Sequence, residues 1–272
     1  MNRPSRLGMA LVLVGALVMV APLVWTLLLS LKSNEELLRD SGAAFHAPYT
    51  LANYRQILSG DMVFRWLLNS FVVSLGTTAG VLALCSLAGF AFARLDFPFR
   101  KPLFAFVLVG LAIPEQAVIL PQHRLFAWAG LHNSYPGLIL PGLVGSFGVF
   151  FMTQYFRGLP RDLDEAAALD GATTFQIFWR VLLPLTLPAQ ATLGVFTFLG
   201  SWNAYWWPLI SATTSDMFTL TIGLASSQAN YAQTNGLGYL MAQAMFASIP
   251  IFIVYILFQK QIVGAMSGAA AK

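Results

Sequence analysis

The strongest constraint on this chain is a series of six apolar segments, each close to the length of about 20 residues that a helix needs to cross a bilayer. The sequence has only 10% charged residues, whereas soluble domains average about 25%. Its mean hydropathy is +0.70. We therefore predict an all-α integral membrane protein with six transmembrane helices at Leu7–Leu31, Trp66–Phe92, Leu103–Phe126, Tyr135–Tyr155, Pro184–Ile210 and Leu240–Phe258.

The first apolar segment has two interpretations. Arg3 and Arg6 precede it, as basic residues precede the apolar part of a secretory signal peptide. However, the segment has no small-residue cleavage site and runs for about 25 residues, which is too long for the apolar region of a signal peptide. We predict that it is retained as the first span.

The distribution of Lys and Arg predicts the orientation, because cytoplasmic loops carry an excess of them. With the N-terminus inside, ten of these residues fall on the inner side and five on the outer side, so both termini are predicted in the cytoplasm. The inner residues are Arg3, Arg6, Arg94, Arg100, Lys101, Arg157, Arg161, Arg180, Lys260 and Lys272, and the outer ones are Lys32, Arg39, Arg55, Arg65 and Arg124.

Residues 1–272 are expected to form a single transmembrane domain with three notable loops. The outer loop 32–65 mixes charges of both signs with Pro48 and Gly60, which predicts a small exposed cap. The outer loop 211–239 is rich in Ser, Thr, Gln, Asn and Gly, which predicts a hydrated, adaptable surface. The third loop, 158–183, is predicted on the cytoplasmic side.

Several functional classes are excluded by composition. The pI of about 9.4 would suit a nucleic-acid partner, but there is no basic run, and scattered Lys and Arg at helix ends are typical of membrane insertion. Cys85 is the single cysteine, so no internal disulfide forms. His46, His123 and His132 lack metal-ligand spacing, so no metal site is predicted.

The cytoplasmic loop 158–183 has helix signals at fixed positions. Pro160 suits a first helical position, and the carboxylates that follow it favour a helix N-terminus. Gly171 fits a left-handed C-terminal cap, and Thr173 and Gln176 have the spacing of a capping box. We predict a helix, a glycine hinge and a second helix that ends before Pro184.

The first of these helices suits a docking role. Ala166, Ala167 and Ala168 present a low surface that another protein could approach closely, and Glu165 and Asp170 would attract basic groups. The alternative is that the carboxylates and alanines only stabilise the helix itself.

The same residues resemble a family signature. Glu165-Ala166-Ala167, Gly171, and Val181 to Pro184 match the pattern EAA-x3-G-x9-I-x-L-P of permease subunits in binding-protein-dependent ABC importers, with Val181 in place of Ile. The chain is most similar to the carbohydrate class, the maltose-type partner permeases. Further similarity lies at Asn53-Tyr54, Asn69-Ser70, Gly89 to Arg94, Asp170-Gly171-Ala172, Trp202-Asn203 and the tail from Phe258 through Gly264 and Gly268.

The resemblance implies a type I ABC importer permease-like bundle in the bacterial cytoplasmic (inner) membrane. Its expected partners are a second homologous permease, a cytoplasmic ABC ATPase dimer, an extracytoplasmic solute-binding protein and membrane lipid. ATP and Mg are expected on the ATPase and no cofactor on this chain, which has no Gly-x-x-x-x-Gly-Lys-Ser/Thr loop and is not an enzyme by itself. The residues expected to couple to the ATPase are Asp164, Glu165, Ala166, Ala167, Ala168, Asp170, Gly171 and Ala172.

Polar residues within spans are candidates for the substrate pathway. Glu115 follows Pro114, which predicts a broken third span; the alternative is that Glu115 is simply hydrated or pairs with Arg124. The group Trp202, Asn203 and Tyr205 would suit a sugar, while an interfacial aromatic belt is favoured for Trp206 and Trp207. Gln243 and Gln190 are candidates for interhelical hydrogen bonds, and Gln243 is also a pathway candidate.

Two rival functions follow from the residues alone. An ion-coupled secondary transporter would use Glu115 as its coupling acid, but it gives the 158–183 loop no purpose. A membrane enzyme would need paired carboxylates, a Ser/His/Asp set or a His/Cys cluster with workable spacing, and none is found in the sequence. The sequence therefore favours one half of the translocation pathway of an ATP-driven importer for a sugar or sugar-like solute.

Overall fold

The computed structural model describes residues 6–40, 42–59, 61–234 and 236–270, and it describes the side chains in these ranges except those of 61, 228–234 and 260–270. No strand occurs in these ranges, which confirms the all-α prediction. Contacts divide the chain into one unit of Met1–Arg65 and Ile222–Ile251 and a second unit of Trp66–Thr221 and Phe252–Lys272. Arg3 and Lys272, which contributed to the predicted orientation, lie outside the described residues, as do the side chains of the C-terminal tail from Lys260.

Three helices are long and apolar enough to cross a membrane: Arg6–Ser30, Met62–Arg94 and Gly236–Gln259. Three further helix pairs meet the same test but are bent by 104°, 48° and 75° at their breaks. The described residues therefore include between three and six spans by length and composition, and the prediction of six holds if each bent pair crosses as one. The pairs are Arg100–Ala112 with Glu115–Trp128, Tyr135–Leu143 with Ser146–Gly158, and Thr174–Leu185 with Leu187–Trp202.

The first unit contains the predicted cap 32–65, which is folded around a buried lysine. Lys32 is 1% exposed, and its ammonium group donates to the carbonyls of His46 and Pro48. Asn53 donates to the carbonyls of Ser30 and Lys32 and so ties the cap to the first span. The helices of this unit are α1 (Arg6–Ser30), α2 (Asn34–Arg39), η1 (Ala43–Phe45), α3 (Ala52–Ser59) and parts of α14 (Leu220–Thr234) and α15 (Gly236–Ala270).

The segment predicted as the outer loop 211–239 is largely helical, because α14 and the start of α15 occupy much of it. Leu220 and Ile222 are buried. The polar residues that suggested a loop are accommodated within the helix, since the hydroxyls of Ser226 and Ser227 both donate to the carbonyl of Gly223.

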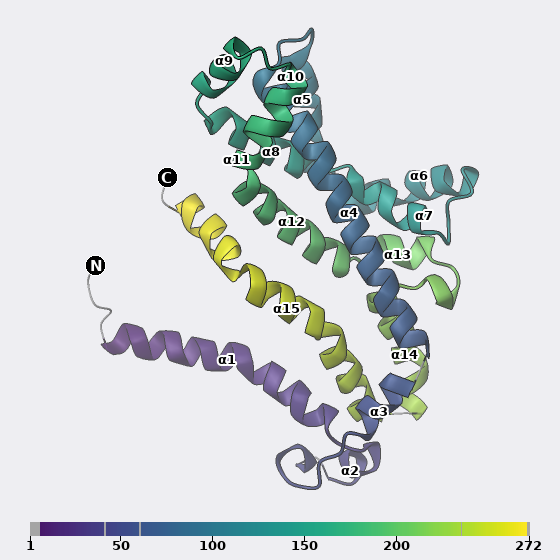
Figure 1. Cartoon of the computed structure of the whole chain (residues 1–272). Helices are drawn as coiled ribbons and strands as arrows, with labels where there is room; N and C mark the ends of the chain where they lie inside the picture. The colour runs from purple at the N-terminus through teal and green to yellow at the C-terminus, as the bar shows by residue number, and fades with distance from the viewer. Residues whose placement is uncertain (1–5, 41, 60, 235, 271–272) are drawn as a thin grey trace. The chain divides into compact units, whose positions relative to one another are not determined.

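The core of the second unit lies where α4 (Asp61–Arg94) crosses α8 (Ser146–Gly158). Gly89 permits the close approach, because a Cβ atom there would lie 2.9 Å from the carbonyl carbon of Met152 and 3.0 Å from the nitrogen of Thr153. The remaining helices of the unit, many visible in Figure 1, are α5 (Arg100–Val109), η2 (Gly110–Ala112), α6 (Glu115–Trp128), α7 (Tyr135–Ile139), η3 (Leu140–Leu143), α9 (Asp162–Leu169), α10 (Thr174–Gln176), the π-helix η4 (Ile177–Leu182), α11 (Leu183–Leu185), α12 (Leu187–Trp202), α13 (Trp206–Ser211) and η5 (Ser215–Met217).

Asn69, one of the residues that carry the family resemblance, joins segments far apart in the sequence. Its amide donates to the carbonyls of Asp216 and Phe218, at 2.7 and 2.8 Å, and its oxygen accepts from Tyr135 at 2.7 Å. Trp66 donates to the carbonyl of Ser215, at 2.7 Å. The segment that follows α13 is thereby fixed to α4.

Candidate coupling surface and translocation cavity

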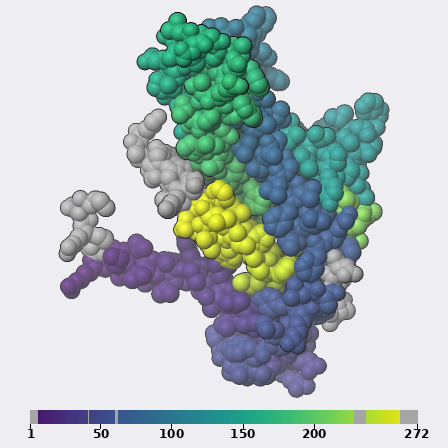
Figure 2. Space-filling view, viewed as in Figure 1, coloured from purple at the N-terminus to yellow at the C-terminus, as the bar shows by residue number. Residues whose placement is uncertain are grey.

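The segment 158–183 forms a helix, a glycine turn and a second helix, as the sequence predicts. The helix α9 begins at Asp162, so the prediction that it starts at Pro160 is wrong by two residues. Its first turn holds Asp162, Asp164 and Glu165, where the partial positive charge of the helix N-terminus favours carboxylates. In the space-filling view the segment protrudes at the upper end of the second unit (Figure 2).

Gly171 ends α9 in a Schellman motif. Its φ is +80°, the left-handed region in which glycine has no steric cost. The amide of Ala172 donates to the carbonyl of Ala167 and that of Gly171 to Ala168, both at 3.0 Å. These bonds occupy two carbonyls that the helix end would leave free.

The predicted capping box follows directly after the turn. The backbone amide of Gln176 donates to Thr173 Oγ1 at 3.3 Å, and the backbone amide of Thr173 donates to Gln176 Oε1 at 2.7 Å. The end of α9 and the start of α10 are therefore both capped within the segment, and local hydrogen bonds fix the angle between the two helices.

The second helix does not end before Pro184, and this prediction is wrong. The chain continues from α10 through the π-helix η4 into α11, which contains Pro184. The amide of Leu183 donates to the carbonyl of Phe178, five residues back, so a wider turn precedes the proline. The sharp bend of 75° comes only after α11.

The two glutamine side chains predicted to bond between helices behave differently. Gln190 donates to the carbonyl of Leu183 and to the hydroxyl of Thr186, so it bridges the bend after α11 and does not reach another span. Gln243 is 2% exposed, and its Oε1 has no hydrogen-bond partner among the described atoms.

The outward face of α9 and its neighbours combines small, acidic and large apolar side chains. Glu165, Ala166, Ala168 and Asp170 are exposed, while Ala167 and Ala172 are half-buried. Exposed large apolar side chains lie beside them at Leu169, Phe175 and Trp179, with exposed fractions of 89%, 66% and 59%. A surface of this kind is typical of a protein contact.

Asp164 does not belong to the outward face. Its Oδ2 lies 2.7 Å from Arg94 Nε, and Arg94 is the last residue of α4. Burial raises the pKa of Asp164, and the positive charges of Arg94 and Arg161 offset part of that effect. The sequence placed Asp164 with the docking residues; the structure directs its carboxylate inward.

A cavity of about 900 Å³ lies in the second unit between α4, α6, α12 and α13. Glu115 lines it, at the start of α6 and after the predicted break at Pro114, where the chain bends by 104°. No ion pair joins Glu115 to Arg124 in the described part of the chain. The other polar residues of its wall are Thr77, Gln122, Ser146, Thr197 and Ser201.

The other four predicted pathway residues lie outside this wall. Trp202 is 3% exposed and packs on Phe198, with ring centroids 5.6 Å apart. Asn203 caps α12 by donating to the carbonyl of Leu199. Tyr205 is partly exposed and contacts the ring of Trp206. Gln243 belongs to the other unit.

Trp207 is the aromatic residue of this region that does line the cavity. It is 6% exposed and donates to the carbonyl of Gly137 at 2.8 Å, so its assignment to an interfacial belt is wrong. Gln122 was also missed by the sequence analysis. A signal was present, since Glu115, Val118, Gln122 and Phe126 have the spacing of one helix face and all line the cavity.

No group of three or more His, Cys, Asp or Glu side chains that could hold a metal ion occurs among the described residues. The rings of His123 and His132 do lie close together, with centroids 4.5 Å apart and a tilt of 36°, but His132 is already bonded to the Ser211 hydroxyl and the His123 carbonyl.

Comparison with known proteins identifies the family. Residues 85–268 match the family described as binding-protein-dependent transport system inner membrane component. The chain belongs to this family. It is thus the permease subunit of an ABC importer, and the ion-coupled secondary transporter is not favoured.

Two curated relatives match this permease over nearly its whole length. The arabinooligosaccharides transport system permease protein AraQ of Bacillus subtilis (strain 168) is 36% identical, over 94% of this chain and 92% of that protein. The diacetylchitobiose uptake system permease protein NgcG of Streptomyces coelicolor is 31% identical, over 98% of this chain and 88% of that protein.

A solved structure has the same fold as this permease. It is a chain of a bacterial ABC transporter involved in the import of the acidic polysaccharide alginate. The TM-score is 0.84 at 21% sequence identity, over 96% of this chain and 99% of that chain. The ABC importer permease fold expected from the sequence is thereby confirmed.

Proposed function

We propose that this permease forms half of the translocation pathway for a carbohydrate or sugar-like solute and is driven by a cytoplasmic ABC ATPase dimer that binds ATP and Mg. The other half is a second homologous permease, and an extracytoplasmic binding protein delivers the solute. The relatives named for oligosaccharide uptake support the solute class. The complex lies in the bacterial cytoplasmic membrane with both termini of this chain inside.

The observation that carries the coupling role is the preformed surface of 158–183. The Schellman motif at Gly171 and the capping box at Thr173 fix its shape by local bonds. Glu165, Ala166 and Leu169 are exposed, and α9 contains no buried residue. The described part of the chain therefore leaves this face uncovered. We infer that the ATPase subunit covers this face and that its closure moves α9.

The cavity beside Glu115 supports the pathway role. Hydroxyl, amide and carboxylate groups there, together with the Trp207 ring, offer the hydrogen bonds and aromatic surface that a sugar can use. Glu115 is the acid in this wall, and we propose that it contacts the solute during passage.

The coupling proposal is tested with Glu165→Lys and Gly171→Leu. Each has a matched control: Glu35 is an exposed acid in the first turn of α2, and Gly130 has a φ of +67° with open space around it. The measurements are co-purification of the ATPase subunit and stimulation of its activity by loaded binding protein, at matched permease levels.

We expect Glu165→Lys and Gly171→Leu to lose co-purification or stimulation, and Glu35→Lys and Gly130→Leu to retain both. Full stimulation in the two loop variants would overturn the coupling proposal. A fall in membrane abundance with normal activity per molecule would also overturn it, because the loop would then only stabilise its own fold.

A further inference from the structure

Arg94 holds the two ends of a turn against the end of α4. Its side chain is 6% exposed, with Nε 2.7 Å from Asp164 Oδ2. Its Nη2 donates to the carbonyl of Leu159 at 2.8 Å. Leu159 directly follows α8 and Asp164 lies in the first turn of α9, so one guanidinium group contacts the chain on both sides of the 159–164 turn.

Besides the contacts of Arg94, α9 lies against η4, but it buries little apolar surface. None of its residues is buried, and Leu163 is its one residue that packs against the core cluster of α4, α8, η4 and α12. A helix with so little buried apolar surface gains little positional definition from apolar packing. The ion pair therefore has a large share in fixing where α9 lies.

The pair is also sensitive to the loss of either partner. A charge with this little exposure is strongly destabilising if its partner is removed. Asp164 Oδ1 is buried and has no hydrogen-bond partner, so Arg94 supplies the ionic contact of this carboxylate. The position of Arg94 at the C-terminal end of α4 adds a favourable interaction with the helix dipole.

We propose that Arg94 and Asp164 are positioning residues that clamp α9 to α4, so that a displacement of α9 by the ATPase moves α4 with it. This rests on the proposed coupling role of 158–183. The pair does not contact the ATPase or the solute; it acts by making α9 and the end of α4 one mechanical body.

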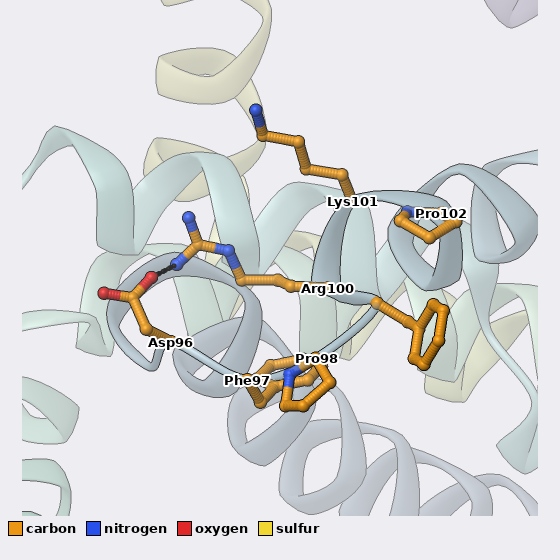
Figure 3. Close-up of a pocket in the computed structure, with 7 residues that line it drawn as sticks. Asp96, Phe97, Pro98, Arg100, Lys101 and Pro102 are labelled. Atoms are coloured by element: carbon orange, nitrogen blue, oxygen red, sulfur yellow. Dashed lines mark ion pairs between the residues drawn. The ribbon is translucent and has the colours of Figure 1, made fainter.

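The decisive variant is the double substitution Arg94→Gln with Asp164→Asn in the whole transport complex. It removes both charges together, so no buried charge is left unpaired, and the amides keep similar size. Single variants Asp164→Asn and Arg94→Gln complete a double-mutant cycle. The control is Asp96→Asn. It removes the ion pair of Asp96 with Arg100, whose charged atoms lie 2.7 Å apart close to the same end of α4 (Figure 3). In contrast to Asp164, the Asp96 side chain is 95% exposed.

The complex is reconstituted in vesicles with the ATPase and binding protein, and the ATP hydrolysed per solute imported is measured with ATPase co-purification. We expect the double variant to retain the ATPase subunit but to consume about fivefold or more ATP per solute, the lower range for coupled sites. The double variant should be no worse than the worse single variant, and Asp96→Asn should match the native complex.

Two results distinguish the possible failures. A double variant with native abundance and native ATP per solute would overturn the clamp while leaving the coupling role intact. Absence of ATPase co-purification with the native chain would instead overturn the proposed function, and with it the clamp.

Discussion

Lys32 is a charged residue whose side chain is almost completely buried. Besides its bonds to two carbonyls, its ammonium group lies 4.4 Å from the centre of the Tyr49 ring and 3.8 Å from Glu36. Burial of such a group is tolerated only when every donor finds a partner or a ring face. The buried lysine thus holds the segments of the cap 32–65 together.

Lys32→Met should destabilise the chain, because it leaves the carbonyls of His46 and Pro48 without this donor. A hydrogen bond to a charged group contributes about 1.5–3 kcal/mol. Thermal unfolding of the purified complex should show a lower midpoint, while Lys101→Met, at an exposed lysine, should leave it unchanged. Equal midpoints for the two variants would mean that the lysine is not needed to hold the cap.

Glu115→Gln should change the solute concentration that gives half-maximal uptake, or the maximal rate, by about threefold or more, because a weaker neutral hydrogen bond replaces a charge-assisted one. Uptake in vesicles measures both. Complex assembly should be normal, because Glu115 is exposed at the cavity wall. Asp96→Asn removes an exposed carboxylate outside the cavity and serves as control; identical kinetics for all three proteins would exclude Glu115 from the pathway.

At the scale of elements, the crossing of α4 and α8 depends on backbone proximity. Gly89→Ala should lower the unfolding midpoint, since its methyl group would meet the backbone of Met152 and Thr153, which cannot move away as a flexible side chain can. The expected loss is about 1–3 kcal/mol. Gly15→Ala, with no atom within 4 Å of the added methyl group, is the matched control and should be neutral.

How far these elements could be predicted depends on the range of the interactions. Gly171, Thr173 and Gln176 act on neighbours within a few residues, so their cap geometry follows from sequence rules. The bend after Pro114 follows from a missing amide. The inward turn of Asp164 could not be predicted, because its partner Arg94 lies on another helix.

The remaining errors have the same origin in tertiary context. Composition favours an aromatic belt for Trp207, because it cannot reveal the hydrogen bond that the indole donates to the Gly137 carbonyl. A local effect conceals the helix α14, because the hydroxyls of its polar residues Ser226 and Ser227 bond back to its own backbone. Trp202 and Asn203 are neighbours in the sequence, but Trp202 packs in the core and Asn203 caps the end of α12.

At the scale of the whole molecule, the topology of the spans is the property that remains to be measured. A cysteine at exposed Ser215 should react with an impermeant thiol reagent on intact cells, and one at exposed Thr174 only after lysis. Cys85 is first replaced, although its burial already limits its reaction. The reverse pattern of labelling would place 158–183 outside the cell, away from any ATPase.

The π-helix η4 makes the length of the chain between α10 and α12 a functional quantity. A π-turn holds one residue more than an α-turn, and a helix rotates by about 100° per residue. The π-turn already accommodates one extra residue, so inserting a further residue into Ile177–Leu182 would rotate the exposed Phe175 by about 100° relative to α12. The direction in which the docking face points therefore depends on the number of residues in this segment, and such an insertion would misdirect it without altering any residue on it.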